Sequence, residues 1–373
     1  GDLPYPDLKT RRGDGRARLD LRLAAARLAA GENTLRDADL HLALDGQTAG
    51  WIETFRIDGT GGAELRAARV DGPGGSASTA SLRLTEARTR VARDANGMSW
   101  RLDGGAVLSA ARAAGGGLDG VGVNLSAARL ALGGRGAAVE AEGPVSLSAD
   151  RLDWDDLSLT AVRGAADFDL VSDGGLRLNA SGGFRAARGA WPLFGPPAGD
   201  DPPELAGMKQ ALAAFAVDAP AFQLSTGHSG TRLTLARPAT LRPMNGGLLT
   251  IRPVATPIFA APQGQAGSGA LALTASRGAG LPEAAFAIPA WGLTPSGFTA
   301  VLDGRAALDF GLARGIALQT RGELASSGGR LTYVAARCIP LTVERLELDE
   351  NDVAGIGGEI CPVERPLVSV ADG

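Results

Sequence analysis

Histidine and cysteine, which often serve as catalytic bases, nucleophiles or metal ligands, each occur only twice in the 373 residues. His41 stands on the polar side of an alternating segment, and His228 stands in a turn next to glycine. No cysteine or paired-carboxylate cluster accompanies either histidine at metal-ligand spacing. We therefore expect both histidines to be solvated surface residues, and we expect no metal site.

Motifs for nucleophilic catalysis and phosphate binding are also missing. Gly227-His228-Ser229-Gly230 does not meet the G-x-S-x-G spacing of a nucleophile elbow, and no G-x-x-x-x-G-K-[ST] loop occurs. The Gly-Gly pairs precede strand-like rather than helix-like segments, which argues against phosphate-binding loops. The sequence therefore predicts that the protein is not an enzyme and uses no cofactor.

The two cysteines, Cys338 and Cys361, flank a strand-like stretch close to the end of the chain. An antiparallel hairpin could bring them within bonding distance. The disulfide would close a loop of 24 residues, which the chain-entropy model values at about 3 kcal/mol. Two unrelated free thiols are the alternative. If the cysteines pair, the compartment is oxidising, most simply a bacterial periplasm.

Composition and charge narrow the class of protein further. The formal net charge is −4 and the basic residues are scattered, so a nucleic-acid partner is not expected. No run of about 18 apolar residues occurs that could span a membrane. The sequence begins without a signal peptide and is expected to be a segment of a longer protein, with any anchor or export signal outside it.

Alternation of apolar and polar residues with a period of two is the strongest pattern in the chain. In Arg16–Leu23 the leucines lie on one face and the charges on the other, and the same pattern returns many times, for example at 39–45, 81–84 and 232–235. Such alternation is typical of an antiparallel sheet with one solvated face. Alanine-rich Leu23–Leu28 would also fit a helix, but its alternating flank and Gly31 favour a strand.

Glycine pairs and Asp-Gly dipeptides are expected to form the hairpin turns of a meander. They occur about every ten to fifteen residues, at Asp45-Gly46, Asp58-Gly59, Asp103-Gly104, Asp173-Gly174-Gly175 and Asp303-Gly304. Asp-Gly suits the positive φ angles of tight hairpin turns.

One proline-rich segment interrupts the alternation and divides the chain. Residues 191–220 are expected to hold a linker and a short amphipathic helix, between a first β section at 1–190 and a second at 221–373. Asp201 is a candidate N-cap. The apolar face of the helix would carry Leu205, Met208, Leu212 and Phe215. Prolines after residue 237 predict irregular or edge strands in the second section.

The last forty residues carry the most specific pattern. Cys338-Ile339-Pro340-Leu341 leads to Ile360-Cys361-Pro362 and Arg365-Pro366-Leu367, and a change in apolar parity between Val343 and Leu346 predicts a β-bulge. This arrangement resembles the YdbH family of bacterial envelope proteins, which are relatives of TamB, YhdP and AsmA. The segments 3–8, 212–215 and 231–243 are similar to that family too.

The resemblance implies an all-β fold: an elongated, curled antiparallel β-sheet that forms an apolar groove and carries phospholipids between the inner and outer membranes. It places the chain in the periplasm of a Gram-negative bacterium, anchored to the inner membrane by a segment outside the chain, with partner proteins in both membranes. It makes the following apolar residues candidates for the groove lining: Leu19, Leu21, Leu23, Leu40, Leu42, Leu44, Leu82, Leu84, Val145, Leu147, Leu157, Leu159, Leu176, Leu178, Leu233, Leu235, Leu271 and Leu273.

Periodicity alone leaves other architectures open. The same leucines would fill the closed core of a sandwich or of a structural or adhesive β-solenoid. A parallel β-helix should add a regular coil period and stacked ladders, and a carbohydrate-active β-protein should add aromatic platforms and close carboxylates. We find neither pattern in the sequence.

Overall fold

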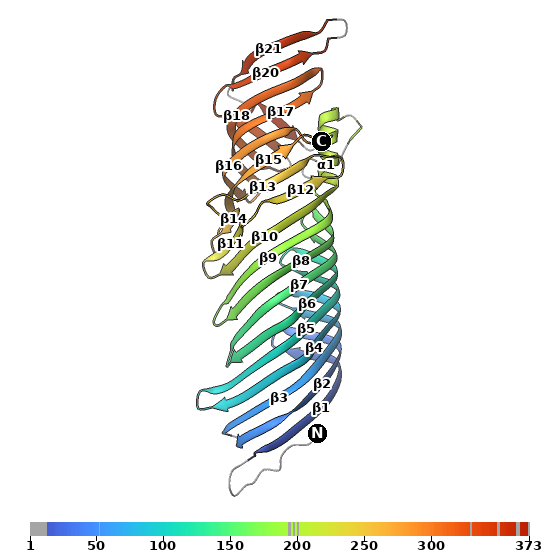
Figure 1. Ribbon diagram of the computed structural model, residues 1–373, viewed down its shortest axis with the longest axis vertical. Coiled ribbons are helices and arrows are strands. Elements are labelled where there is room, and N and C mark those ends of the chain that lie inside the picture. The colour runs from blue at the N-terminus through green and yellow to red at the C-terminus, as the bar shows by residue number, and fades with distance from the viewer. Residues whose placement is uncertain are drawn as a thin grey trace. The chain divides into compact units, whose positions relative to one another are not determined.

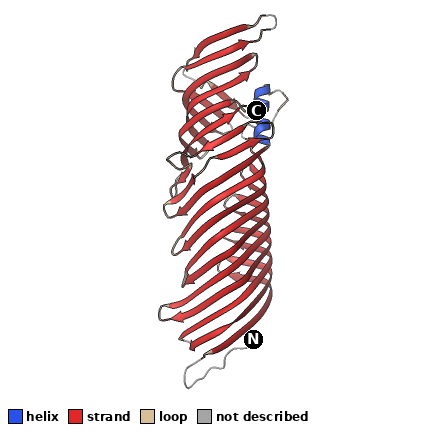
Figure 2. Ribbon diagram, viewed as in Figure 1, coloured by secondary structure: helices blue, strands red, loops and turns tan. Residues whose placement is uncertain are grey.

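The computed structural model describes residues 13–371 except 52, 193–194, 197, 200, 329, 349–350 and 363–365. These residues form 22 strands and one short helix (Figures 1 and 2). The strand pairings are antiparallel, which confirms the predicted all-β fold with a curled antiparallel sheet and one helix. The opening segment 3–8 lies outside the described residues.

The chain divides into two compact units, residues 1–155 with 160–182 and residues 156–159 with 183–373. The first unit is a meander of long strands that follow one another in chain order (Figure 1). Its strands are β1 (Gly15–Ala30), β2 (Asn33–Trp51), β3 (Thr54–Gly72), β4 (Gly75–Asp94), β5 (Gly97–Gly115), β6 (Leu118–Arg135), β7 (Ala138–Trp154) and the greater part of β8 (Leu157–Ser172).

Segment Leu23–Leu28 lies within β1, so the strand prediction there is confirmed. The meander differs from the prediction in strand length, since β2 to β5 have 19 or 20 residues each. The expected Asp-Gly turns at Asp45, Asp58 and Asp103 are wrong, because these pairs lie inside β2, β3 and β5. Asp303-Gly304 likewise lies inside β17 (Gly297–Phe310), whereas Asp173-Gly174 does form a turn.

Close backbone approach, rather than turning, explains the glycines at these positions. A Cβ at Gly46 would lie 2.3 Å from the carbonyl oxygen of Asp58, and one at Gly104 would lie 2.7 Å from the Cα of Ala87. Register shifts occur along the same part of β3 to β7, beginning between Gly61 and Ala63. The strands bend here, and only a residue without a side chain fits.

A second bend crosses the strands along a row of small residues, which we call the alanine crease. Asp37, Thr79 and Gly122 have φ angles of 49°, 48° and 62° on the alternate strands β2, β4 and β6. Pairing is interrupted at these residues and resumes beyond them without a register shift. Ala161 of β8, with φ 51°, completes the series on the next alternate strand. The buried side chains beside this crease are Ala38, Ala67, Ala110, Ala149 and Val162.

The second unit contains the remaining elements. They are β9 (Leu176–Ala190), whose first residues belong to the first unit, α1 (Pro203–Ala213), β10 (Phe215–Gly227), β11 (Gly230–Leu235), β12 (Ala239–Pro243), β13 (Leu248–Arg252), β14 (Phe259–Ala261), β15 (Ser268–Ser276), β16 (Glu283–Thr294), β17, β18 (Ala313–Ser327), β19 (Arg330–Ala335), β20 (Ile339–Leu346), β21 (Val353–Ile360) and β22 (Val368–Ala371).

Several short strands of this unit are halves of one interrupted strand. β10 pairs with both β11 and β12, and β18 pairs with both β19 and β20. The breaks fall at Ala236–Pro238 and Ala336–Cys338, and in each the first residue still donates its N–H to the neighbouring strand, at Ala221 and at Arg321. Proline at position 238 cannot donate to a ladder, which accords with the predicted irregularity of this section.

Two details of the second unit correct the predictions. Pro202 rather than Asp201 occupies the N-cap position of α1, and Phe215 begins β10 instead of ending the helix. Asp201 instead accepts a hydrogen bond from the Ala198 N–H and pairs with Lys209 at 2.8 Å. The residues that α1 buries are Gly207 and Ala211, because the helix packs closely against the loop at Ala279.

The predicted bulge between Val343 and Leu346 is also wrong. β20 keeps one register with β18 and β21 across this stretch. The parity changes at Glu344, whose two neighbours across the strands, Gly315 and Gly355, have φ angles of 63° and 70°. A left-handed residue redirects the chain without inserting an extra residue.

Candidate functional site

Seven leucines from seven consecutive strands lie directly opposite one another in a single cross-strand row, which we call the leucine row. The row runs from β1 to β7 through Leu23, Leu40, Leu65, Leu82, Leu108, Leu125 and Leu147. The buried alanines of the crease stand two residues away on the same strands and therefore on the same face. The sheet of the first unit thus has a continuous aliphatic band across its strands.

Most of the predicted lining residues of the first unit join this band. Leu21, Leu42 and Leu84 share the adjacent row, with Ala63 between the last two, and Leu19 pairs with Leu44. Val145 precedes Leu147 by two residues on β7, so it shares the face. Leu157 and Leu159 of β8, which belong to the second unit, are half-buried.

The predicted lining residues of later strands lie in separate places. On β9, Leu178 is half-buried and Leu176 is exposed. In the second unit Leu233 lies opposite Leu224 and Phe259, and Leu235 opposite Phe222. Leu271 and Leu273 lie opposite Ile288 and Phe286. The sequence candidates therefore form one band in the first unit and further apolar pairs in the second.

An additional apolar row was not anticipated from the sequence. Beyond the alanine crease the apolar positions change parity, and a row continues through Leu28, Leu35, Val70, Ala77, Ala113, Gly120 and Leu152. A repeated Ala-x-Arg signal marks the change: Ala67, Ala110 and Ala149 are buried, and the arginine two residues after each is exposed. This signal is readable in the sequence, but a search for strict alternation passes over it.

The apolar band is only partly covered. Leu19, Leu21 and Leu23 are 37–41% exposed, and Leu108 is 40% exposed. Most buried apolar residues are alanines, and among the described residues Phe215 is the one large side chain that is fully buried. Leucines at this exposure can still gain contacts with an apolar molecule.

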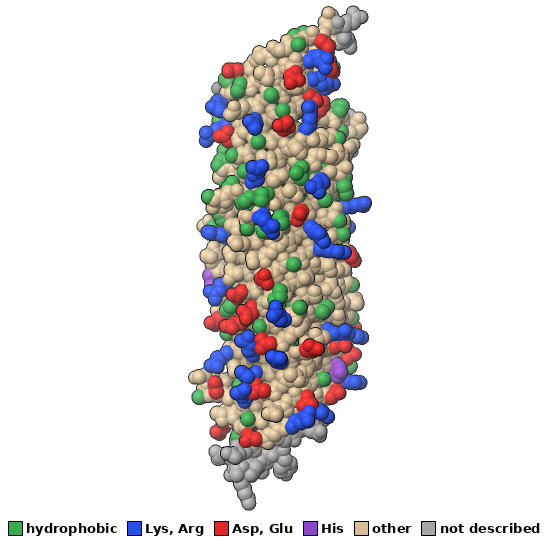
Figure 3. Space-filling view, viewed as in Figure 1, with side chains coloured by type: hydrophobic (Ala, Val, Ile, Leu, Met, Phe, Trp, Pro, Cys, Tyr) green, Lys and Arg blue, Asp and Glu red, His purple; other side chains and the backbone are tan. Residues whose placement is uncertain are grey.

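Charged side chains occupy the opposite face, and Figure 3 shows basic and acidic groups interspersed over the visible surface. Arg16 binds Asp45 through two hydrogen bonds of 2.9 and 2.6 Å, and Arg18 binds the same carboxylate. These hydrogen bonds lower the pKa of Asp45 to about 2. Asp58 is held in the same way by Arg56 and Arg90, which lower its pKa. One face is therefore ionic and the other aliphatic.

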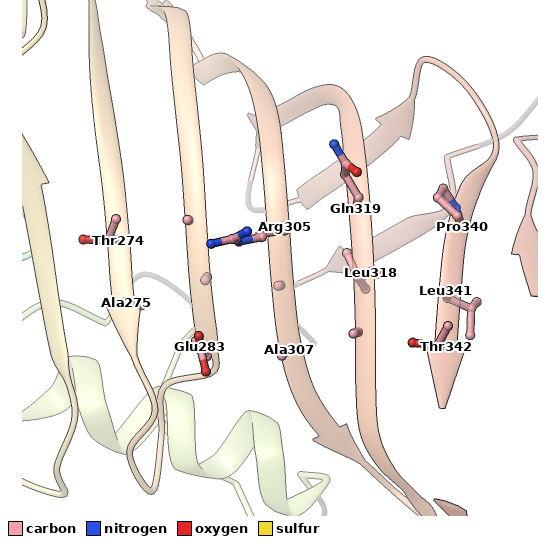
Figure 4. A pocket seen from close by; sticks show the side chains of 14 residues that line it. Thr274, Ala275, Glu283, Arg305, Ala307, Leu318, Gln319, Pro340, Leu341 and Thr342 are labelled. Carbon is pink, nitrogen blue, oxygen red and sulfur yellow. The ribbon is translucent and has the colours of Figure 1, made fainter. Parts of the chain in front are cut away.

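A cavity of about 540 Å³ crosses β15 to β18 and β20 in the second unit (Figure 4). Small residues such as Ala284 and Ala306 form much of it, and Arg305 extends over it towards β16. The lining includes Thr274, Glu283 and Gln319, which makes it mixed in polarity. No cluster of acid, base and nucleophile occurs among its lining residues.

Potential metal-binding groups come together in the described residues only at Cys338, Glu359 and Cys361. The two cysteines form a disulfide, which confirms the predicted pairing. Because a disulfide sulfur is not a thiolate, this cluster lacks the charged ligands of a zinc site. None of the described helices has the length and hydropathy that a membrane span requires.

Comparison with known proteins finds no matching family model and no matching curated protein. The function must therefore be argued from the two-faced sheet itself.

Proposed function

We propose that this chain is a periplasmic section of a bridge-like lipid carrier, in which phospholipid acyl chains lie along the apolar face of the sheet. Partner proteins in the inner and outer membranes would supply and receive the lipid. The observation that carries the proposal is the leucine row, which continues across seven strands and stays partly exposed.

The dimensions of the row suit an acyl chain. Six strand spacings of about 4.8 Å give a row of roughly 29 Å. One leaflet of a bilayer holds about 15 Å of hydrocarbon. An acyl chain can thus lie along the row in full, and it can move along the row without losing apolar contact.

The free-energy cost of exposing an acyl chain to water is large compared with other contributions to binding. Each methylene exposed to water costs about 0.8 kcal/mol, so a sixteen-carbon chain costs on the order of 12 kcal/mol. A continuous aliphatic surface removes much of this barrier and needs no reactive group. Carriage along the row therefore requires no catalytic residue.

The exposed surface argues against the alternative of a closed solenoid core. The chain exposes 22436 Å² at a mass of 37.8 kDa. A compact monomer of this mass would expose roughly 14,000 Å², and two separate compact halves roughly 17,000 Å². A single folded layer with an accessible apolar face accounts for the excess.

The disulfide supports the proposed compartment. Cys338 and Cys361 are joined in the structure, and such bonds persist in oxidising compartments such as the periplasm.

The test is native mass spectrometry, with lipid extraction, of the chain purified from a bacterial envelope. We expect bound phospholipid in the wild type and little in a variant with Leu125→Asp and Leu147→Asp, which are neighbours in the leucine row. Two carboxylates in the apolar band would strongly disfavour acyl contact.

The matched control is Ser126→Asp with Ser148→Asp, which places the same charges one residue further along the same strands, on the polar face. Both variants must keep the β-sheet circular dichroism spectrum. A folded wild type without lipid, or equal loss of lipid in both variants, would refute the proposal.

A further inference from the structure

The cavity across β15 to β18 and β20 is lined by two neighbouring cross-strand rows (Figure 4). The first row consists of Glu283, Ala307, Ala317 and Thr342. The second row consists of Thr274, Ala285, Arg305 and Gln319. The two rows lie two residues apart on each strand, so their side chains point to the same face of the sheet. Alanines in the middle and longer side chains around them leave a hollow in this face.

Two opposite charges line the hollow without pairing. Arg305 and Glu283 are both exposed, and within the described part of the chain neither side chain forms an ion pair or a hydrogen bond. The carboxylates of β17 differ, since Asp303 pairs with Arg321 at 3.9 Å and Asp309 pairs with Arg277. In Figure 4, Arg305 extends towards β16, and Glu283 stands further along that strand. The cavity therefore offers one cationic and one anionic group at separate places.

The spacing of the two charges suits a very short peptide. Arg305 lies opposite Ala285, which is two residues from Glu283 on β16. Two residues of a strand span about 7 Å, and two residues of a free extended peptide span about the same length. The carboxylate and the ammonium group of a dipeptide can thus reach Arg305 and Glu283 at the same time.

The rest of the lining fits such a ligand. The volume of about 540 Å³ lies within the range of small-molecule sites, which is roughly 300–1,000 Å³. Gln319 and the threonines 274 and 342 carry hydrogen-bonding groups at the sides of the cavity, where they can bind a peptide amide. The alanines of the floor leave room for small side chains.

We propose that this cavity binds a dipeptide-sized zwitterion, with its carboxylate at Arg305 and its ammonium group at Glu283. The inference is independent of lipid carriage, since none of these residues belongs to the apolar band of the first unit.

The probe is alanyl-alanine with free termini, and the full chain is titrated with it by isothermal calorimetry. Two further probes block one terminus each, by N-acetylation or by C-terminal amidation. We expect saturable binding of the free dipeptide. Each blocked form should bind about tenfold more weakly, because it loses one charge-assisted hydrogen bond.

Two variants assign the termini to their side chains. Arg305→Gln should remove the preference for the free carboxylate over the amide, and Glu283→Gln should remove the preference for the free ammonium group over the acetyl form. Each variant should keep the other preference, which a general loss of structure would not do. The matched control is Arg321→Gln, an arginine of β18 that pairs with Asp303 outside the cavity and should leave all three affinities unchanged.

Three outcomes would overturn the proposal. A folded wild type without saturable binding would show that the hollow takes no dipeptide. Equal binding of the free and blocked forms would remove the role of the two charges. Binding of phosphoethanolamine in place of the dipeptide, with the same dependence on Arg305 and Glu283, would make a lipid headgroup the ligand.

Discussion

At Gly46 the neighbouring strand leaves no room for a side chain, since an added Cβ would lie 2.3 Å from the carbonyl oxygen of Asp58. Gly46→Ala should therefore lower the free energy of unfolding by about 1–3 kcal/mol, as overpacking does elsewhere. Denaturant titration of both proteins measures the difference. Gly74→Ala is the matched control, because an added Cβ there meets nothing within 4 Å; an equal loss in both variants would contradict the explanation.

The ion pairs of the polar face predict a pH dependence. Hydrogen bonds from Arg16 and Arg18 lower the pKa of Asp45 to about 2 in the folded state, below the value of about 3.9 for an unfolded chain. A lowered folded pKa stabilises the protein above the unfolded pKa, and this stabilisation disappears as the pH falls from about 4 to about 2.

Asp45→Asn should reduce the slope of stability against pH in that window and leave the slope above pH ~5 unchanged. The effect should be small, since the side chains of Arg16 and Asp45 are 69% and 39% exposed to solvent. Denaturant midpoints at a series of pH values measure both slopes. An unchanged acid slope would show that the pair contributes nothing to stability.

The left-handed residues of the alanine crease occupy equivalent positions on alternate strands. Introducing glycine at one of these positions and removing it from another should therefore have opposite effects on stability. Thr79 and Ala161 hold φ angles of 48° and 51°, which are costly for residues with a Cβ, whereas Gly122 of β6 already lacks one. Thr79→Gly and Ala161→Gly should each stabilise the fold by about 1 kcal/mol. Gly122→Ala should destabilise it, because a Cβ there would lie 2.2 Å from Asp150 Oδ2. Thermal unfolding compares the three; destabilisation by Thr79→Gly would contradict the assignment.

The disulfide joins the ends of β20 and β21, and it lies at the break between β19 and β20. Cys338 and Cys361 directly adjoin the pair Ile339 and Ile360, at the point where both strands leave the ladder. Replacing both cysteines by serine should cost about 3 kcal/mol, and the loss should be confined to β19–β22. Hydrogen exchange should rise there and stay unchanged in β2–β6; a uniform rise would show that the bond stabilises more than this end.

Alternation in the sequence was enough to predict the sheet and the apolar positions of β1, β2 and β4. The placement of the two cysteines around a strand-like stretch predicted the disulfide. The prediction failed where the same dipeptide can occur in two different structures. Asp45-Gly46 has the composition of a hairpin turn, yet here the glycine permits two strands to approach each other. Only the register of a neighbouring strand separates the two cases, and that information is not local.

Other residues of the band escaped prediction for a related reason. Leu65, Leu108 and Leu125 belong to the leucine row, but their strands place alanine and glycine where β1 and β2 have further leucines. The row beyond the crease, from Leu28 to Leu152, has the opposite parity to the rest of each strand. A left-handed residue such as Asp37 lies at the change on alternate strands, and a search for strict alternation does not reveal it.

For the whole molecule, the large exposed surface predicts an unusually small heat capacity change. Unfolding exposes about a fifth less surface than it would for a compact protein of this mass, because so much is already exposed in the native state. The heat capacity increment summed over all transitions should therefore be about a fifth below the usual value per residue. Scanning calorimetry measures it; an ordinary value would indicate a closed core.

The left-handed residues of the crease recur once in every two strands, at Asp37, Thr79, Gly122 and Ala161. The repeating module is therefore a hairpin and not a single strand. Removing residues 38–79 would join Asp37 to Ala80, so that Asp37 takes the place of Thr79 and Leu82 takes the place of Leu40 opposite Leu23. Sheets of this design can be lengthened or shortened in steps of about 10 Å, two strand spacings at a time. The distance that such a chain reaches is thus set by how many hairpins are copied, and evolution can adjust it without redesigning any of them.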